Sequence, residues 1–152
     1  AGPLAPLKAR LEAEGWRTQA QADWSAVLTL LDDDVPPAEQ PILPATLGTS
    51  SEALLMRRDL DNTRAEVLRL WRAPVRLDDG TELWVGTSQA MLHTRPFDQF
   101  GLWQPQTDTR EVHAGLRDVL QGFEWREEPH PYSDVPTLRL RTSPADSTQE
   151  AP

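Results

Sequence analysis

The sequence predicts an α+β fold, an antiparallel meander of about four to six strands packed with about three helices. Two observations predict it. Apolar residues recur at helical spacing near both ends of the chain, and four short strand-like runs follow one another in its middle. Asp79-Gly80 between the last two runs is typical of a tight hairpin turn, which indicates antiparallel pairing.

Three segments have the pattern of amphipathic helices. The first carries Leu4, Leu7 and Leu11 on one stripe and stops at Gly15, a residue common just after a helix. The second is expected over residues 24–31, where apolar residues repeat at i, i+3, i+4 and i+7. The third is expected over residues 112–123, after Asp108 and Glu111, which together resemble a capping box.

The strands are expected between and after these helices. The residues of each strand-like run are enriched in apolar side chains and bounded by turn residues. The runs cover residues 53–60, 64–71, 75–77 and 83–86, and a further hairpin is expected from 125–128 and 137–141. Segments 35–44, with four prolines, 47–51 and 96–106 are expected to be irregular.

The length of 152 residues predicts one domain, residues 1–142, followed by a disordered tail, residues 143–152. A chain of this size buries enough surface to fold without a disulfide or a metal. Cysteine is absent, which excludes disulfides, thiolate nucleophiles and zinc–thiolate sites.

The net charge of −9 argues against nonspecific binding to nucleic acid, which needs basic groups to displace counterions from phosphates. We therefore expect no nucleic-acid partner. The charge is uneven along the chain. Residues 53–77 hold six arginines against three acidic residues, a net charge of +3 on an acidic molecule.

This basic segment contains the only ligand site that the sequence predicts. Arg69, Trp71, Arg72 and Arg76 combine forked guanidinium groups with an aromatic ring, a set suited to phosphate or carboxylate. The predicted ligand is an anionic group. The alternative is that these arginines pair with the surplus Asp and Glu residues at the surface.

No catalytic, metal or cofactor site is predicted. His93, His113 and His130 are not at the spacing of metal ligands, and no serine lies in a nucleophile motif. The run of three aspartates at 32–34 is more typical of a solvated helix end than of a cation site. Of the six tryptophans, Trp16 and Trp103 fall in predicted loops and are the better candidates for contacting a partner.

Several stretches, in this order, are similar to a known family. They read LKARLEAEGW (7–16), WSAVLTLL (24–31), LP (43–44), EALLMRR (52–58), VLRLW (67–71) and DGTELWVGT (79–87). Over residues 6–123 the chain resembles the LssY C-terminal domain. Members often carry an LPxLHDGR-like stretch before the EAL strand, whereas residues 43–50 here read LPATLGTS.

The resemblance implies a context more than a reaction. Such domains follow DedA-type or type 2 phosphatidic-acid-phosphatase segments in bacterial inner-membrane proteins, and the phosphatase motifs belong to those segments. It implies a noncatalytic soluble accessory domain, tethered to the inner membrane on a side that the sequence does not define. The implied partners are the membrane segment of its own parent chain, another protein or an anionic lipid headgroup. The alternative is a hydrolase of phosphorylated lipid intermediates, which would need histidine or carboxylate side chains gathered in one pocket.

Overall fold

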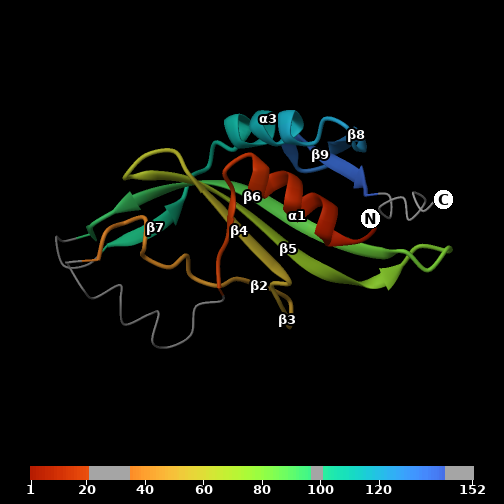
Figure 1. Cartoon of the computed structure of the whole chain (residues 1–152), viewed down its shortest axis with the longest axis horizontal. Coiled ribbons are helices and arrows are strands. Elements are labelled where there is room, and N and C mark those ends of the chain that lie inside the picture. The colour runs from red at the N-terminus through yellow and green to blue at the C-terminus, as the bar shows by residue number, and fades with distance from the viewer. Residues whose placement is uncertain (21–34, 97–100, 143–152) are drawn as a thin grey trace, which may run out of the picture.

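The computed structural model describes residues 1–20, 35–96 and 101–142 and confirms the α+β class. Its centre is a five-stranded antiparallel sheet in the order β1-β4-β5-β6-β7 (Figure 1). These strands are β1 (Arg17–Thr18), β4 (Leu54–Asp59), β5 (Arg64–Arg76), β6 (Glu82–Thr94) and β7 (Leu102–Pro105). The other described elements are α1 (Leu4–Ala13), α3 (Arg110–Val119) and two hairpins, β2 (Thr46–Leu47) with β3 (Ser50–Ser51), and β8 (Glu124–His130) with β9 (Ser133–Arg141).

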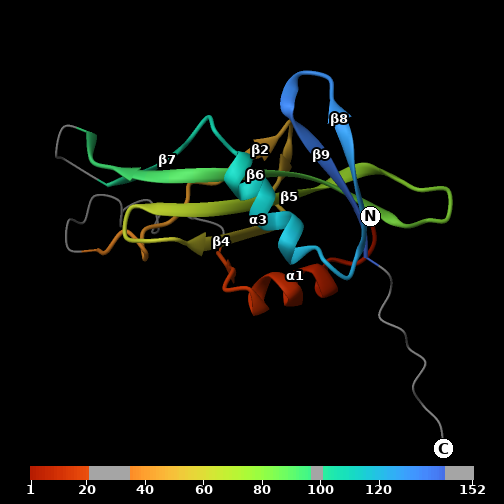
Figure 2. The same ribbon diagram turned by 90° about the horizontal axis from the view of Figure 1, so that it is seen from above.

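Side chains on the sheet alternate between two separate apolar clusters, because successive residues of a strand point to opposite faces. One face packs Met56 and Leu68, which are directly opposite in the register, against Leu11 of α1 and Leu116 of α3. Both helices therefore cover the same face of the sheet, as the two views show (Figures 1 and 2). The other face carries a second cluster with members Ile42, Leu55, Ala65, Val67, Met91 and Trp103.

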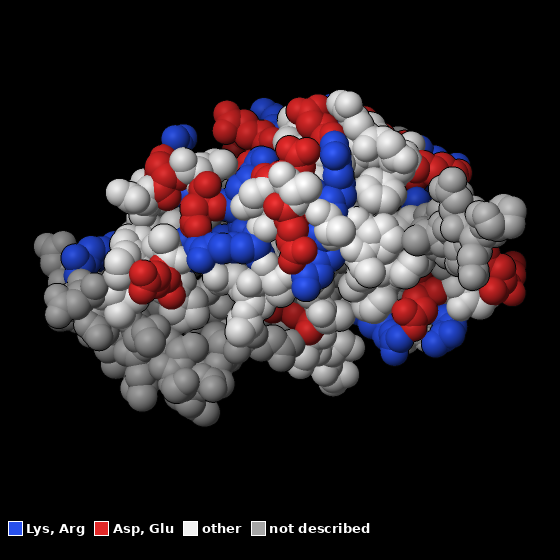
Figure 3. All heavy atoms as spheres, in the orientation of Figure 1, with Lys and Arg blue, Asp and Glu red and all other residues white. Residues whose placement is uncertain are grey.

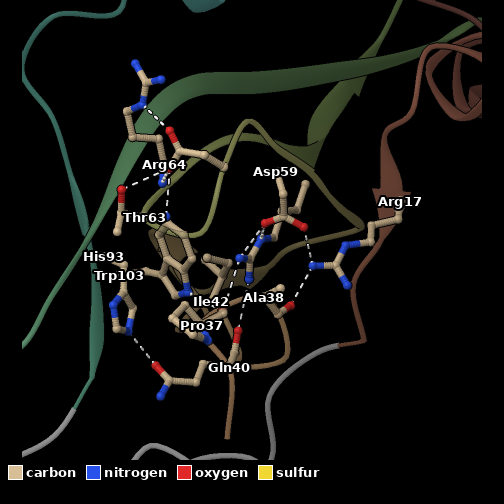
Figure 4. A network of polar contacts seen from close by, with 12 residues as sticks. Arg17, Pro37, Ala38, Gln40, Ile42, Asp59, Thr63, Arg64, His93 and Trp103 are labelled. Carbon is tan, nitrogen blue, oxygen red and sulfur yellow. Dashed lines mark hydrogen bonds and ion pairs between the residues drawn. The ribbon is translucent and has the colours of Figure 1, made fainter.

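The proline-rich segment lies over this second face and is held there by a buried arginine. Arg57 has no exposed surface, and its guanidinium donates to the carbonyl oxygens of Gln40 (3.0 Å) and Pro37 (3.2 Å). It also donates to Asp59 and lies 4.2 Å from the ring centre of Trp103. The indole N–H of Trp103 donates to the same Pro37 carbonyl (Figure 4). Two backbone carbonyls of a segment without regular structure thereby have hydrogen-bond donors.

The structure corrects several expected boundaries. The runs at 64–71 and 75–77 form one strand, β5, with a register shift between Arg72 and Arg76. β6 continues to Thr94 rather than ending at residue 86, β7 lies within the expected irregular segment 96–106, and β2 and β3 replace most of the expected loop 47–51. The helix expected at 24–31 and the tail 143–152 lie outside the described residues, which contain two helices where about three were expected.

No helix in the described part of the chain combines the length and the hydrophobicity that a membrane crossing requires.

Candidate ligand-binding cavity

A cavity of about 360 Å³ lies on the helix-bearing side of the sheet, where α1, α3, β6 and the β8–β9 hairpin meet. Its wall is mainly aliphatic. Two leucines come from each of four places in the fold, α1, β5, the C-terminal half of α3 with its cap, and β9. They are Leu4, Leu7, Leu68, Leu70, Leu116, Leu120, Leu138 and Leu140.

The cavity exists because the β8–β9 hairpin is held apart from the sheet instead of pairing with it. On one side, Glu127 of β8 forms an ion pair with Arg117 of α3 at 2.5 Å. On the other, Ala1 and Gly2 lie between β9 and β6. The N–H of Thr142 donates to the carbonyl of Ala1 (2.9 Å), and the N–H of Gly2 donates to the carbonyl of Glu82 (3.0 Å).

A glycine is required at position 2, between β9 and β6, because of the backbone conformation there and the atoms around it. Its φ of 106° is a value that side chains strongly disfavour. A Cβ there would lie 2.3 Å from the carbonyl oxygen of Thr142. The Gly2 carbonyl in turn accepts a hydrogen bond from the indole N–H of Trp84 at 2.8 Å, so the aromatic ring of the wall is fixed in place.

The wall contains polar groups but no Asp, Glu, Lys or Arg side chain of the described residues. His113 and His130 both line the cavity, together with serine and threonine side chains. Burial, and after it the charge of Arg117, lowers the pKa of His113, while Glu127, 3.6 Å away, acts in the opposite direction. A neutral imidazole at pH 7 follows from this lowered pKa.

Two arrangements common in catalytic sites are not found among the described residues of the cavity. Neither cavity histidine is hydrogen-bonded to a serine or threonine in the described residues, so a nucleophile activated by a base is not assembled there. The same part of the chain contains no group of three or more His, Asp or Glu side chains placed to hold a metal ion. The aliphatic wall of the cavity is suited to contact with an apolar group.

The structure separates the four residues of the predicted anion site. Arg69 and Trp71 point to the face opposite the helices, and only 6% and 4% of their surfaces are exposed. Arg69 forms an ion pair with the buried Glu52 and donates to the carbonyl of Leu43 at 3.0 Å. The positive charge of Arg69 is thus compensated by Glu52 in the protein interior.

Arg72 and Arg76 lie further along β5, where the strand leaves the core. Arg72 points to the helix side, pairs with Glu82 and lies 5.7 Å from the ring centre of Trp84. Arg76 approaches the same carboxylate at 3.4 Å. The tryptophan beside Arg72 is therefore Trp84 rather than the predicted Trp71.

All six arginines of segment 53–77 contact a carboxylate, so the geometry favours the alternative that the sequence left open. The pairs are Arg57–Asp59, Arg58–Glu66, Arg64–Asp61, Arg69–Glu52, Arg72–Glu82 and Arg76–Glu82. Acidic and basic side chains are interspersed on the face drawn in Figure 3. The anion site remains a prediction.

Sequence reasoning missed the cavity. Leu138 and Leu140 lie in the hairpin expected at 137–141, and their alternation with Arg139 and Arg141 is the one signal of a face turned toward apolar partners. The expectation for Trp16 and Trp103 was wrong. Both are core residues, 2% and 4% exposed, although each lies next to loop sequence.

Comparison with known proteins finds no match among family models, curated proteins or solved structures. The resemblance to the LssY C-terminal domain therefore remains a prediction from the sequence, and the site is interpreted from its own geometry.

Proposed function

We propose that this chain is a noncatalytic binding domain whose cavity takes up an aliphatic group of its ligand. The observation that carries this proposal is the convergence of leucines from four elements on one cavity whose described wall has no Asp, Glu, Lys or Arg side chain. Ligand pockets typically enclose about 300–1,000 Å³ and are mainly apolar with a few polar groups. The cavity has that size and that composition.

An aliphatic group fits this wall better than a flat aromatic one. Trp84 is the one aromatic side chain of the wall besides the two imidazoles, and its N–H is already bonded to Gly2. Leucine methyl groups provide dispersion contacts and shelter from water, at about 0.8 kcal/mol for each methylene group buried. They provide no stacking plane.

The resemblance to the LssY C-terminal domain supplies a context for such a ligand. In an accessory domain of an inner-membrane lipid phosphatase, aliphatic groups are present as lipid chains and as apolar segments of the parent chain or a protein partner. Tethering to that membrane is part of this proposal. A hydrolase of phosphorylated lipids has no comparable support, since no described carboxylate lines the cavity beside the two histidines.

The test uses decanol as a plain aliphatic probe and a matched pair of variants on one strand. Ser88 lies opposite Leu68 on the helix side of the sheet and lines the cavity, whereas Gln89 lies opposite Val67 on the other face. Decanol should raise the melting temperature of the native protein by several degrees at a hundred times its dissociation constant, where binding contributes about 2.7 kcal/mol.

Ser88→Leu should reduce this shift because its larger side chain occupies part of the cavity, and Gln89→Leu should keep it. A decanol shift that both variants retain in full, or its absence from the native protein, would contradict the proposal.

An anionic headgroup remains a second candidate at one place. Arg72 and Arg76 share the single carboxylate of Glu82 at exposed positions, which leaves one positive charge uncompensated beside Trp84. If this pair binds phosphate, then replacing both arginines with alanine should remove any phosphate-dependent rise in melting temperature. An unchanged rise would exclude the pair.

A further inference from the structure

The edge of β6 that faces away from β5 is paired at both ends and open in the middle. At one end the carbonyl of Ala90 accepts a hydrogen bond from the N–H of Gln106 at 2.8 Å, next to the β6–β7 ladder. At the other end the carbonyl of Glu82 accepts from the N–H of Gly2 at 3.0 Å. Between these two hydrogen bonds β6 is not paired with β7, whose register with β6 covers only Met91 to Thr94.

Three residues in this interval present their backbone groups to the open edge. In an antiparallel strand, the N–H and C=O of every second residue point to the same side. Glu82 and Ala90 are bonded on the side away from β5, so Trp84, Gly86 and Ser88 point the same way. The register with β5 is unbroken over these residues. Within the described ranges, the backbone N–H and C=O groups that these three residues direct away from β5 have no backbone hydrogen-bond partner.

This edge also lacks the features that protect exposed strand edges. Proteins usually place proline or charged side chains on such edges to prevent pairing with other chains. Residues 84–90 read WVGTSQA, with neither, and residues 85–87 are exposed. The strand across the cavity, β9, does contain a proline, Pro136.

The molecule already holds extended chain in one end of this space. Ala1 and Gly2 bridge β9 and β6 through backbone hydrogen bonds, and the cavity begins beside them. Trp84, Gly86 and Ser88 belong to the wall of the same cavity. Hydrogen-bonding groups of a strand edge and an aliphatic pocket are thus side by side.

From this juxtaposition we infer that the ligand is an extended polypeptide segment that pairs with β6 and inserts aliphatic side chains into the cavity. The inference rests on the proposed function and names the class of its ligand. An added strand satisfies the N–H and C=O groups of the edge and carries side chains to one face at every second residue. A lipid chain would contact the leucines but would leave these backbone groups without partners.

The open edge of β6 determines the length and the charge expected of the bound polypeptide segment. The interval from Glu82 to Ala90 spans about 26 Å at roughly 3.3 Å per residue, which leaves room for about five residues beyond the existing pairs. The edge and the described cavity wall carry no charged side chain, so the segment should be uncharged where it enters. Its pattern is two aliphatic residues separated by one small or polar residue.

The test is a library of acetylated, amidated five-residue peptides with Leu, Ile or Val at the second and fourth positions and Ser or Thr elsewhere. The binding members are then resynthesised with N-methyl groups on the peptide nitrogens of residues 2 and 4, or of residues 1, 3 and 5. Because only alternate N–H groups face β6, one of these two sets should weaken binding at least tenfold and the other should not. Equal binding of both sets and the parent peptide would overturn the inference.

A protein variant tests the same edge independently. Ser88→Pro removes an N–H that points away from β5, so the variant should fold, with the cooperative thermal unfolding of Ser88→Ala, and should bind the peptides at least tenfold more weakly than Ser88→Ala. If decanol binds in the cavity but no peptide binds, or if Ser88→Pro binds peptides like Ser88→Ala, the inference fails alone. If neither decanol nor any peptide binds, the proposed function fails with it.

Discussion

At the scale of single residues, buried charge is used to hold irregular chain in place. Arg57 reaches two carbonyl groups of the proline-rich segment, and Asp59 links it to Arg17, which donates to a third carbonyl, that of Ala38 (Figure 4). The sequence showed an excess of arginine in this part of the chain but could not show which arginines turn inward. Which arginines turn inward depends on which face of the sheet the proline-rich segment covers.

Removal of this guanidinium should therefore be costly. Arg57→Ala leaves the carbonyls of Pro37 and Gln40 without a donor in the protein interior, together with a cavity beside Trp103. We expect the free energy of unfolding in urea to fall by about 3–5 kcal/mol. The matched control is Arg64→Ala, since Arg64 pairs with Asp61 at the surface and should change stability little. Similar losses for both variants would contradict the role given to Arg57.

His113 predicts how stability depends on pH. Burial and Arg117 of α3 lower its pKa, and Glu127 of β8 opposes them only in part. The unfolded chain, in which the histidine pKa is about 6.5, then binds more protons than the folded one, so stability should fall as the pH drops below that value. Melting temperatures from pH 8 to pH 5 should fall less steeply for His113→Asn. An unchanged slope would contradict the role given to His113, since burial also lowers the pKa values of His93 and of the Ala1 amino group.

At the scale of elements, the sequence predicted those helices, strands and turns that local residue patterns determine. The leucine stripe and Gly15 of the first helix, the strand β4, the two runs that join into β5 and the Asp79-Gly80 turn were all found. The extent of β6 beyond residue 86 was missed because its polar run TSQ has no apolar alternation and is held by its register with β5. β7 was missed because its four residues lie between loop-like sequences.

The segment Ala1–Gly2, which separates the β8–β9 hairpin from the sheet, gives a prediction at this scale. Gly2→Ala places a methyl group against the Thr142 carbonyl at a strained φ, and should destabilise the protein by about 2–4 kcal/mol. The control is Gly15→Ala, which has a similar φ of 82° but open space around the new Cβ, and should cost about 1 kcal/mol.

Hydrogen exchange should locate the damage from Gly2→Ala. Backbone amides of β9 should exchange faster in that variant and not in Gly15→Ala. Unchanged β9 exchange would show that Ala1 and Gly2 do not hold the hairpin in position.

At the scale of the whole molecule, the distribution of charge changes its meaning once the chain is folded. The described residues contain all 15 basic residues against 17 acidic ones, so they are close to neutral. Within them, the net positive segment 53–77 is balanced by its contacts. The arginines that are clustered in the sequence are therefore distributed over two faces of the sheet and the core.

The cavity belongs to this scale too, and it could not be predicted from the sequence. Each of its leucines fits the ordinary pattern of a buried helix or strand face. What leaves space between them is the separation of the β8–β9 hairpin from β6, which depends on contacts between residues more than a hundred positions apart, such as Ala1 with Thr142.

The most direct test of the binding claim is a titration with decanol followed by the methyl resonances of selectively labelled leucines. The account predicts saturable shifts at Leu68, Leu116 and Leu138, which line the cavity from three different elements, and none at Leu55 on the opposite face of the sheet. Shifts that do not saturate, or that are as large at Leu55 as at the cavity leucines, would contradict it.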